Sequence, residues 1–336
     1  MPIKKKKKNI VVLGGGTGTY TVLTGLKEYA DDGISLSAIV SMADSGGSTG
    51  RLRDEFGYLP VGDVRMALAA LAEGENGDNL LRELFLYRFD KGTGLKGHNV
   101  GNLLLVALTD ILGSETKAIQ FAGEVLRIRG KVIPVTTRNV TLSAKYADGS
   151  IVKGETNIDE PPRIHDGTQR IRRLWLDPEA PATPEALSAI RAADMVVLGP
   201  GDLYTSILPN VIAGGVAKAL SKAHAKLVLI VNLMSKYGQT HGFNASDFVT
   251  ETAKYIGRAP DIVLLNNKPL PPSIIKKYRT EQEFPIVDDL APSAGMRVIR
   301  RDFLRPGEVK KASGDVRKIS LVRHDPKKLA RALLSL

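Results

Sequence analysis

Short apolar runs alternate with longer helical patterns along most of this 336-residue chain. The runs at 9–15, 34–44 and 195–201 each end in glycine or aspartate, and a helix-like segment follows each one, as at 19–30. Strands that alternate with helices in this way are typical of βαβ units and a mostly parallel sheet. The sequence therefore predicts a doubly wound α/β fold, whose ligands bind outside the carboxyl ends of the strands.

The middle of the chain breaks this rhythm. Residues 141–156 alternate apolar and polar side chains around an Asp-Gly pair, which predicts an antiparallel hairpin. We therefore expect a single domain over 9–336 with a hairpin-bearing insertion at about 137–180. A last strand is expected at 318–324, before a terminal helix.

Composition excludes several classes of site. The chain has no cysteine, which rules out disulfides, thiolate metal centres and a thiol nucleophile. Its longest apolar run, 66–72, is far shorter than the roughly twenty residues of a membrane span. No apolar stretch of a secretory signal follows the N-terminal lysines. We expect a cytoplasmic protein without a transmembrane segment.

The net charge is +11, and Lys4–Lys8 supply five of those charges. We expect residues 1–8 to form a disordered basic tail, with contact to nucleic acid or anionic lipid as the alternative. Aromatic residues make up only 5% of the chain, and no nucleic-acid-binding motif is recognisable, so we expect no specific nucleic-acid partner.

A glycine-rich loop follows the first expected strand. Small residues let the backbone approach a phosphate, and a helix N-terminus behind them favours an anion. A tight turn without a ligand is the alternative, because Thr19 replaces the third glycine of the dinucleotide fingerprint and no P-loop lysine is present. The candidate ligand-binding residues here are Gly14, Gly15, Gly16, Thr17 and Gly18.

A second loop of this kind follows the second expected strand. Asp44 stands where an acid often holds a ribose, and the arginines suit phosphate or carboxylate. Plain surface charge is the alternative for the arginines. The candidates are Asp44, Ser45, Gly46, Gly47, Ser48, Arg51 and Arg53.

Three further stretches add polar candidates. Asp63 is either a helix N-cap or a second acid that could share Mg²⁺ with Asp44. Asn99 is either an N-cap or a ligand contact, and His98 could donate to a phosphate or exchange a proton. Residues after the apolar run at 195–198 form another anion-binding loop. The additional candidates are His98, Asn99, Asn102, Gly199, Gly201, Asp202, Tyr204 and Thr205.

Taken together, these stretches resemble the YvcK/CofD-like family of gluconeogenesis factors, YvcK branch. The motifs GGGTG, GGSTGRLRDE, GDVR, GHNVGNLL, RGKVIP and GPGDLYTSILPN stand in the family's order. The resemblance implies a Rossmann-like fold and a nucleotide ligand. Its YvcK branch, for which no catalysis is established, implies binding of a UDP-sugar and a role in cell shape on gluconeogenic carbon.

The CofD branch implies an alternative function, a metal-dependent 2-phospho-L-lactate transferase with a nucleoside diphosphate donor. Asp44 and Asp63 match its metal-binding positions, and His98 would join them in catalysis. This chain departs from the family at Ser45, where a second aspartate is common, and at Met66, where asparagine is common. It also departs at Asp202, where serine is usual.

The residues and the resemblance together favour a UDP-sugar-binding regulatory protein over a transferase. A nucleic-acid or membrane-surface protein that uses the lysine run is the third hypothesis. Mg²⁺ is a candidate metal, and NAD is a weaker alternative ligand. A regulatory protein partner and a homo-oligomer are both compatible with the sequence.

Overall fold

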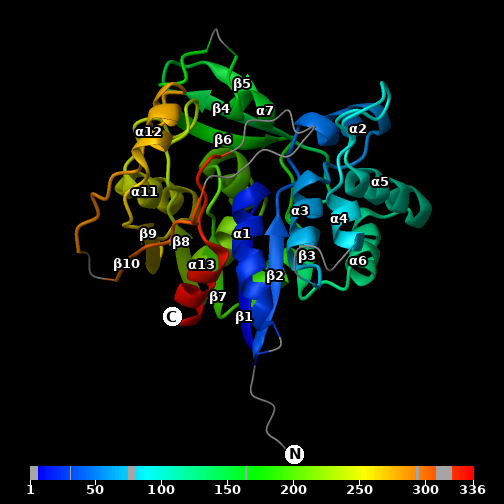
Figure 1. Ribbon diagram of the computed structural model, residues 1–336, viewed down its shortest axis with the longest axis horizontal. Helices are drawn as coiled ribbons and strands as arrows, with labels where there is room; N and C mark the ends of the chain where they lie inside the picture. Colours follow the sequence, from blue (N-terminus) through cyan, green and yellow to red (C-terminus); the bar gives the residue numbers. More distant parts are fainter. Residues whose placement is uncertain (1–6, 31, 75–79, 163–164, 293–294, 308–319) are drawn as a thin grey trace, which may run out of the picture.

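A seven-stranded sheet forms the centre of the computed structural model, which describes residues 7–30, 32–74, 80–162, 165–292, 295–307 and 320–336. Neighbouring strands all run parallel, in the order β10-β9-β8-β7-β1-β2-β3 (Figure 1). The strands are β1 Lys8–Gly14, β2 Ile34–Val40, β3 Lys131–Pro134, β7 Met195–Leu198, β8 Lys226–Ile230, β9 Ile262–Asn266 and β10 Arg297–Arg301. The chain winds outward from β1 in both directions, so the predicted doubly wound α/β fold is confirmed.

Both faces of this sheet are buried, as in other parallel sheets. In β1, Ile10 and Val12 pack into one core, whereas Val11 and Leu13 pack into another on the opposite face, because successive side chains of a strand alternate. The first core includes residues of α1 Gly16–Leu26, α3 Gly62–Leu71, α6 Glu115–Val125 and α13 Pro326–Leu334. The second includes residues of α8 Pro184–Ala192, α9 Leu208–Val211, α10 Val216–Lys222 and α11 Ala245–Ile256.

The remaining helices extend the two layers. On the side of β2 and β3 lie α2 Gly47–Phe56, α4 Leu80–Leu86 and α5 Val100–Leu112, and on the side of β9 lies α12 Pro272–Arg279 (Figure 1). Short helical turns occur at η1 Lys27–Tyr29 and at the π-helical η2 Leu203–Ile207. No helix among the described residues has both the length and the apolar character that crossing a membrane requires.

The expected hairpin belongs to a small antiparallel sheet of order β5-β4-β6, with β4 Thr141–Tyr146, β5 Ile151–Lys153 and β6 Ile171–Asp177. The short helix α7 Glu155–Asp159 follows β5. Side chains of this sheet, among them Leu142 and Leu174, join the core beneath it. Figure 1 shows the sheet at the top of the view, the end towards which β1 runs, so the insertion lies beside the carboxyl ends of the central strands.

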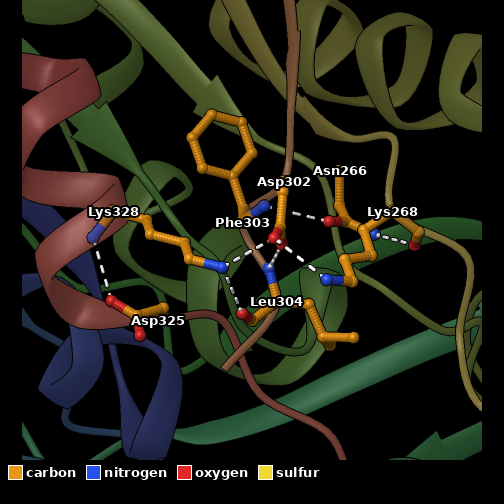
Figure 2. A network of polar contacts seen from close by, with 7 residues as sticks. All are labelled: Asn266, Lys268, Asp302, Phe303, Leu304, Asp325 and Lys328. Carbon is orange, nitrogen blue, oxygen red and sulfur yellow. Dashed lines mark hydrogen bonds and ion pairs between the residues drawn. The ribbon is translucent and has the colours of Figure 1, made fainter. Parts of the chain in front are cut away.

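The helix α13 is fastened to the β9–β10 edge of the sheet by a polar network (Figure 2). The ammonium group of Lys328 donates to Asp302 Oδ2 at 2.8 Å and to the Leu304 carbonyl at 3.0 Å. Lys268 approaches the same Asp302 oxygen at 3.4 Å. On its other side α13 packs directly on α1, since a Cβ at Gly25 would lie 2.1 Å from the Pro326 carbonyl oxygen.

The strand expected at 318–324 does not form in its described part. Residues 320–324 form no strand and make only an isolated bridge between Leu304 and His324, while 318–319 lie outside the described residues. Their backbone is held instead by Tyr278, whose hydroxyl accepts from the Leu321 amide at 2.8 Å. Residues 1–6 of the expected basic tail also lie outside the described part, and Lys8, its last residue, already begins β1.

Candidate functional site

The loops that follow four neighbouring strands of the sheet enclose a cavity of about 520 Å³. Its walls include Gly15 and Gly16 after β1, Asp44 after β2, Gly201 after β7 and Asn232 after β8. The strand order reverses between β1 and β7, so the cavity lies at the topological switch point where open α/β sheets bind ligands.

The glycine loop after β1 forms the first turn of α1. This helix begins at Gly16, three residues before the expected start at Thr19, and Gly15 is its N-cap. A Cβ at Gly18 would lie 1.7 Å from the Pro200 carbonyl oxygen in the loop after β7. Glycine is therefore needed at Gly18 because the two loops at the switch point touch through their backbones.

Asp63 does not cap its own helix, and the N-cap interpretation is wrong. Val61 is the N-cap residue of α3, and Asp63 Oδ1 instead accepts a hydrogen bond of 2.7 Å from the Gly16 amide. A Cβ at Gly15 would lie 2.1 Å from Asp63 Oδ2, so the carboxylate fits tightly against the glycine loop. It is a long-range cap of α1, where a negative charge is favourable.

The second loop starts α2 in the same manner. Gly46 is the N-cap, and its amide donates to Asp44 Oδ1 at 2.8 Å. The second oxygen of Asp44 faces the start of α3, because a Cβ at Gly62 would lie 2.3 Å from Asp44 Oδ2. Asp44 and Asp63 therefore both lie at the junction between the glycine loops and the start of α3.

The side chain of Ser48 in α2 contacts residues at the start of α5. Its hydroxyl oxygen accepts from Asn102 Nδ2 at 3.2 Å and lies 3.3 Å from His98 Nδ1. Burial, and then the charge of Arg51, lowers the pKa of His98, so the neutral ring can accept the Ser48 proton. Asn99 is the N-cap of α5, and its side chain accepts a hydrogen bond from the Gly101 amide at 2.9 Å. Of the two interpretations, N-cap or ligand contact, the N-cap is therefore confirmed.

The loop after β7 is held by a reciprocal pair of hydrogen bonds. The Gly201 amide donates to Asn232 Oδ1 at 3.1 Å, and Asn232 Nδ2 donates to the Gly201 carbonyl at 2.9 Å. Asp202 follows at the N-cap position of η2 and lines the cavity. The backbone of this loop is thus fixed before any ligand arrives.

Twelve of the predicted ligand-binding residues line the cavity, as does the predicted metal ligand Asp63, and the other ligand-binding candidates do not. Arg51 donates to the Lys96 carbonyl at 3.0 Å, and Arg53 pairs with Asp54 at 3.4 Å near the surface. Tyr204 is fully buried, and its ring packs on Phe243. The cavity-lining candidates are Gly15, Gly16, Thr17, Gly18, Asp44, Gly46, Gly47, Ser48, Asn102, Gly201, Asp202 and Thr205, whereas Gly14, Ser45, Arg51, Arg53, His98, Asn99, Gly199 and Tyr204 lie outside the lining.

Sequence reasoning selected Arg51 and Arg53, but the arginines that line the cavity are Arg65, Arg88 and Arg323. Arg65 Nε donates to Asn102 Oδ1 at 2.9 Å, and Arg88 donates to the Gly97 carbonyl at 2.7 Å. A signal for Arg65 was present, because it stands two residues after Asp63 in the quoted GDVR motif.

Two acids of α7 were also missed. Burial, followed by the charges of Asp44, Asp159 and Asp63, raises the pKa of Glu155 well above its usual range. Burial and the neighbouring carboxylate of Asp202 raise the pKa of Asp159 to about 7. Their spacing of four residues on one helical turn was the available signal.

The lining carries seven carboxyl groups against four arginine and lysine side chains. A diphosphate therefore needs local compensation from backbone amides, from the arginines or from a cation. Within the described residues, no three His, Cys, Asp or Glu side chains are arranged to hold a metal ion. Asp44 and Asp63 remain the candidate pair, and two carboxylates together with ligand phosphates are a common Mg²⁺ environment.

Comparison with known proteins identifies the family of the chain. The profile of the family described as 2-phospho-L-lactate transferase CofD matches residues 10–304. The gluconeogenesis factor of Bacillus subtilis is 39% identical over 335 residues, which cover 98% of this chain and 98% of that protein. The gluconeogenesis factor of Halalkalibacterium halodurans is 42% identical over 286 residues, or 84% of this chain and 85% of that protein.

A crystal structure of a Bacillus halodurans protein has the same architecture. It matches with a TM-score of 0.86 at 38% identity, and the match covers 98% of this chain and 100% of that one. The sequence profile, the relatives and the fold all span nearly the same residues. The chain therefore belongs to the CofD family.

Proposed function

We propose that this protein is a regulatory gluconeogenesis factor that binds a UDP-sugar and supports cell shape during growth on gluconeogenic carbon. The observation that carries the proposal is the pair of glycine-initiated helices, α1 and α2, whose first turns line one cavity at the switch point. The first amides of a helix lack intrahelical acceptors, and the helix dipole favours an anion there. A diphosphate is the ligand group that two such helix starts suit.

The remaining parts of a nucleotide have plausible contacts in the same cavity. Asp44 follows β2 and would accept hydrogen bonds from ribose hydroxyls, as acids at this position do in dinucleotide-binding folds. Arg65 and Arg88 would offset part of the diphosphate charge. The Gly16 amide already donates to Asp63, so the phosphates would bind the neighbouring amides of Thr17 and Gly18 and those at the start of α2.

A metal-dependent 2-phospho-L-lactate transferase is the second candidate function, favoured by the CofD family profile over residues 10–304. Asp44 and Asp63 would hold the Mg²⁺, which would neutralise charge on the donor phosphates. We rank this function second because Ser45 replaces a neighbouring acid and Asp202 adds negative charge beside the loop after β7.

The proposal is tested by thermal unfolding with UDP, UDP-glucose, UDP-N-acetylglucosamine, GDP, NAD and inorganic phosphate, each with and without Mg²⁺. A UDP-sugar at a hundred times its Kd should add about 2.7 kcal/mol to the free energy of unfolding. The other ligands, at the same concentration, should add less. A larger effect of GDP, with Mg²⁺-dependent group transfer to a deazaflavin, would establish the second function instead. Equal effects of all six ligands would contradict both.

A further inference from the structure

A second cavity, of about 300 Å³, adjoins the first, and no residue of the glycine loops lines it. Asp159, Glu160, Lys236 and Glu283 line both cavities, so the smaller one is a side extension of the larger. Its outer wall is formed by Pro161, Tyr237 and residues 280–282. The extension is therefore continuous with the cavity in which a diphosphate would bind at α1 and α2.

The shared wall is held in place by a polar network. Gln239 is only 1% exposed, and its Nε2 donates to Asp159 Oδ1 at 2.8 Å and to Thr205 Oγ1 at 3.2 Å. Lys236 Nζ lies 3.5 Å from the same Asp159 oxygen. Because Gln239 anchors the carboxylate from behind, Asp159 and Lys236 reach the cavity in fixed positions, with an acceptor beside a cationic donor.

The charge of this wall disfavours phosphate. Asp159, Glu160, Asp202 and Glu283 surround the single ammonium group of Lys236, whose pKa is raised by Asp202 and Asp159 despite its burial. Its charge is therefore already balanced by carboxylates. A second anion here would meet net repulsion, so the ligand group in this extension must be uncharged.

We propose that the extension is a subsite for an uncharged, hydroxyl-rich ring such as the sugar of a nucleotide-sugar, an inference that rests on the proposed function. Asp159 would accept from one hydroxyl and Lys236 would donate to a neighbouring one, which matches the alternating polarity of a sugar diol. Tyr237 adds an aromatic ring to the same cavity, and its hydroxyl is fixed by the Gly167 amide at 3.2 Å.

The test is calorimetric titration of UDP and of UDP-N-acetylglucosamine into the full chain and into Asp159→Asn and Lys236→Met. The measured quantity is the ratio of the two dissociation constants, which isolates the contribution of the sugar. We expect each variant to reduce that contribution by about tenfold while UDP binds within about twofold of the parent. Lys276→Met on the exposed face of α12 is the matched control and should change neither constant.

UDP binding also reports that a variant has folded, so a misfolded variant cannot imitate the expected result. Equal affinity of the parent for UDP and UDP-N-acetylglucosamine would overturn the subsite, and so would variants that weaken both ligands alike. Binding of neither ligand by the parent would overturn the proposed function itself, and the subsite with it.

Discussion

Gly18 is the position where local and long-range physics make opposite predictions. It lies in the first turn of α1, and replacing a helical glycine with alanine stabilises a typical helix by about 1 kcal/mol. In this fold the new methyl group would lie 1.7 Å from the Pro200 carbonyl oxygen and 2.9 Å from the Gly201 amide nitrogen. Gly18→Ala therefore tests whether the contact between the two loops is as close as described.

The overlap should win. Added methyl groups in packed interiors cost about 1–3 kcal/mol, and the cost is greatest when the neighbour cannot move. Here the neighbour is the backbone of the loop after β7, which the two hydrogen bonds with Asn232 hold in place. After subtraction of the helix-propensity gain, we expect the free energy of unfolding to fall by about 2 kcal/mol.

Equilibrium urea denaturation of the purified chain measures this change directly. Gly94→Ala is the matched control, because a Cβ at Gly94 meets nothing within 4 Å. The control should stay within about 0.5 kcal/mol of the parent. If Gly18→Ala were as stable as the parent or more stable, the backbone contact at the switch point would be refuted.

Gly16→Val should abolish UDP-sugar binding, because Gly16 has φ of +59° and the added side chain would enter the cavity. Calorimetric titration measures this loss, and unchanged affinity would mean that the loop is only a turn. Asp63→Ala should lower the free energy of unfolding by about 1–2 kcal/mol, because the Gly16 amide loses a charged acceptor. In urea denaturation, Asp63→Asn should retain most of the stability that Asp63→Ala loses. The folded pKa of Asp159 is raised to about 7, so its ionisation removes stability as pH rises from about 4 to 7. Asp159→Asn should therefore lose about 2–3 kcal/mol less unfolding free energy than the parent between pH 5 and pH 8. Parallel pH profiles of the two proteins would contradict that assignment.

The parallel fold was predictable because strands buried on both faces read as continuous apolar runs, as in β1, β7 and β8. The glycine loops were predictable for a related reason. They stand directly after those runs, and the carboxyl ends of parallel strands meet at one edge. Twelve predicted ligand-binding residues and the predicted metal ligand Asp63 consequently line one cavity, although they are spread from Gly15 to Thr205.

The role of Asp63 could not be predicted in the same way. The local rule for helix starts favours an aspartate as N-cap, but that rule contains no information about which other helix end lies nearby. The packing of α3 against α1 brings an amide of the glycine loop within 2.7 Å, and this contact replaces the local one.

The same limit explains the missed residues. Asp159 comes from α7 of the insertion, and Lys236 comes from the loop after β8. Neither stands in a motif. Asp159 joins the site because the insertion lies beside the strand ends, and Lys236 joins it because the loop after β8 lies at the same edge of the sheet. Arg51, by contrast, was selected for its place beside a loop, yet its helix carries it towards the Lys96 carbonyl.

The position of β1 in the sheet has a consequence for the order in which the site is made during synthesis. The glycine loop after β1 leaves the ribosome well before its neighbour β7, which begins at Met195, and before α13, which supports α1 and begins at Pro326. A nascent chain can pair β1 with β2 early, but one edge of β1 must stay open until β7 arrives. Such long-range closure slows folding, because distant segments must meet before their contacts stabilise anything. The cavity can therefore be completed only after β7 has been synthesised, although it is built around a strand that precedes β7 in the chain.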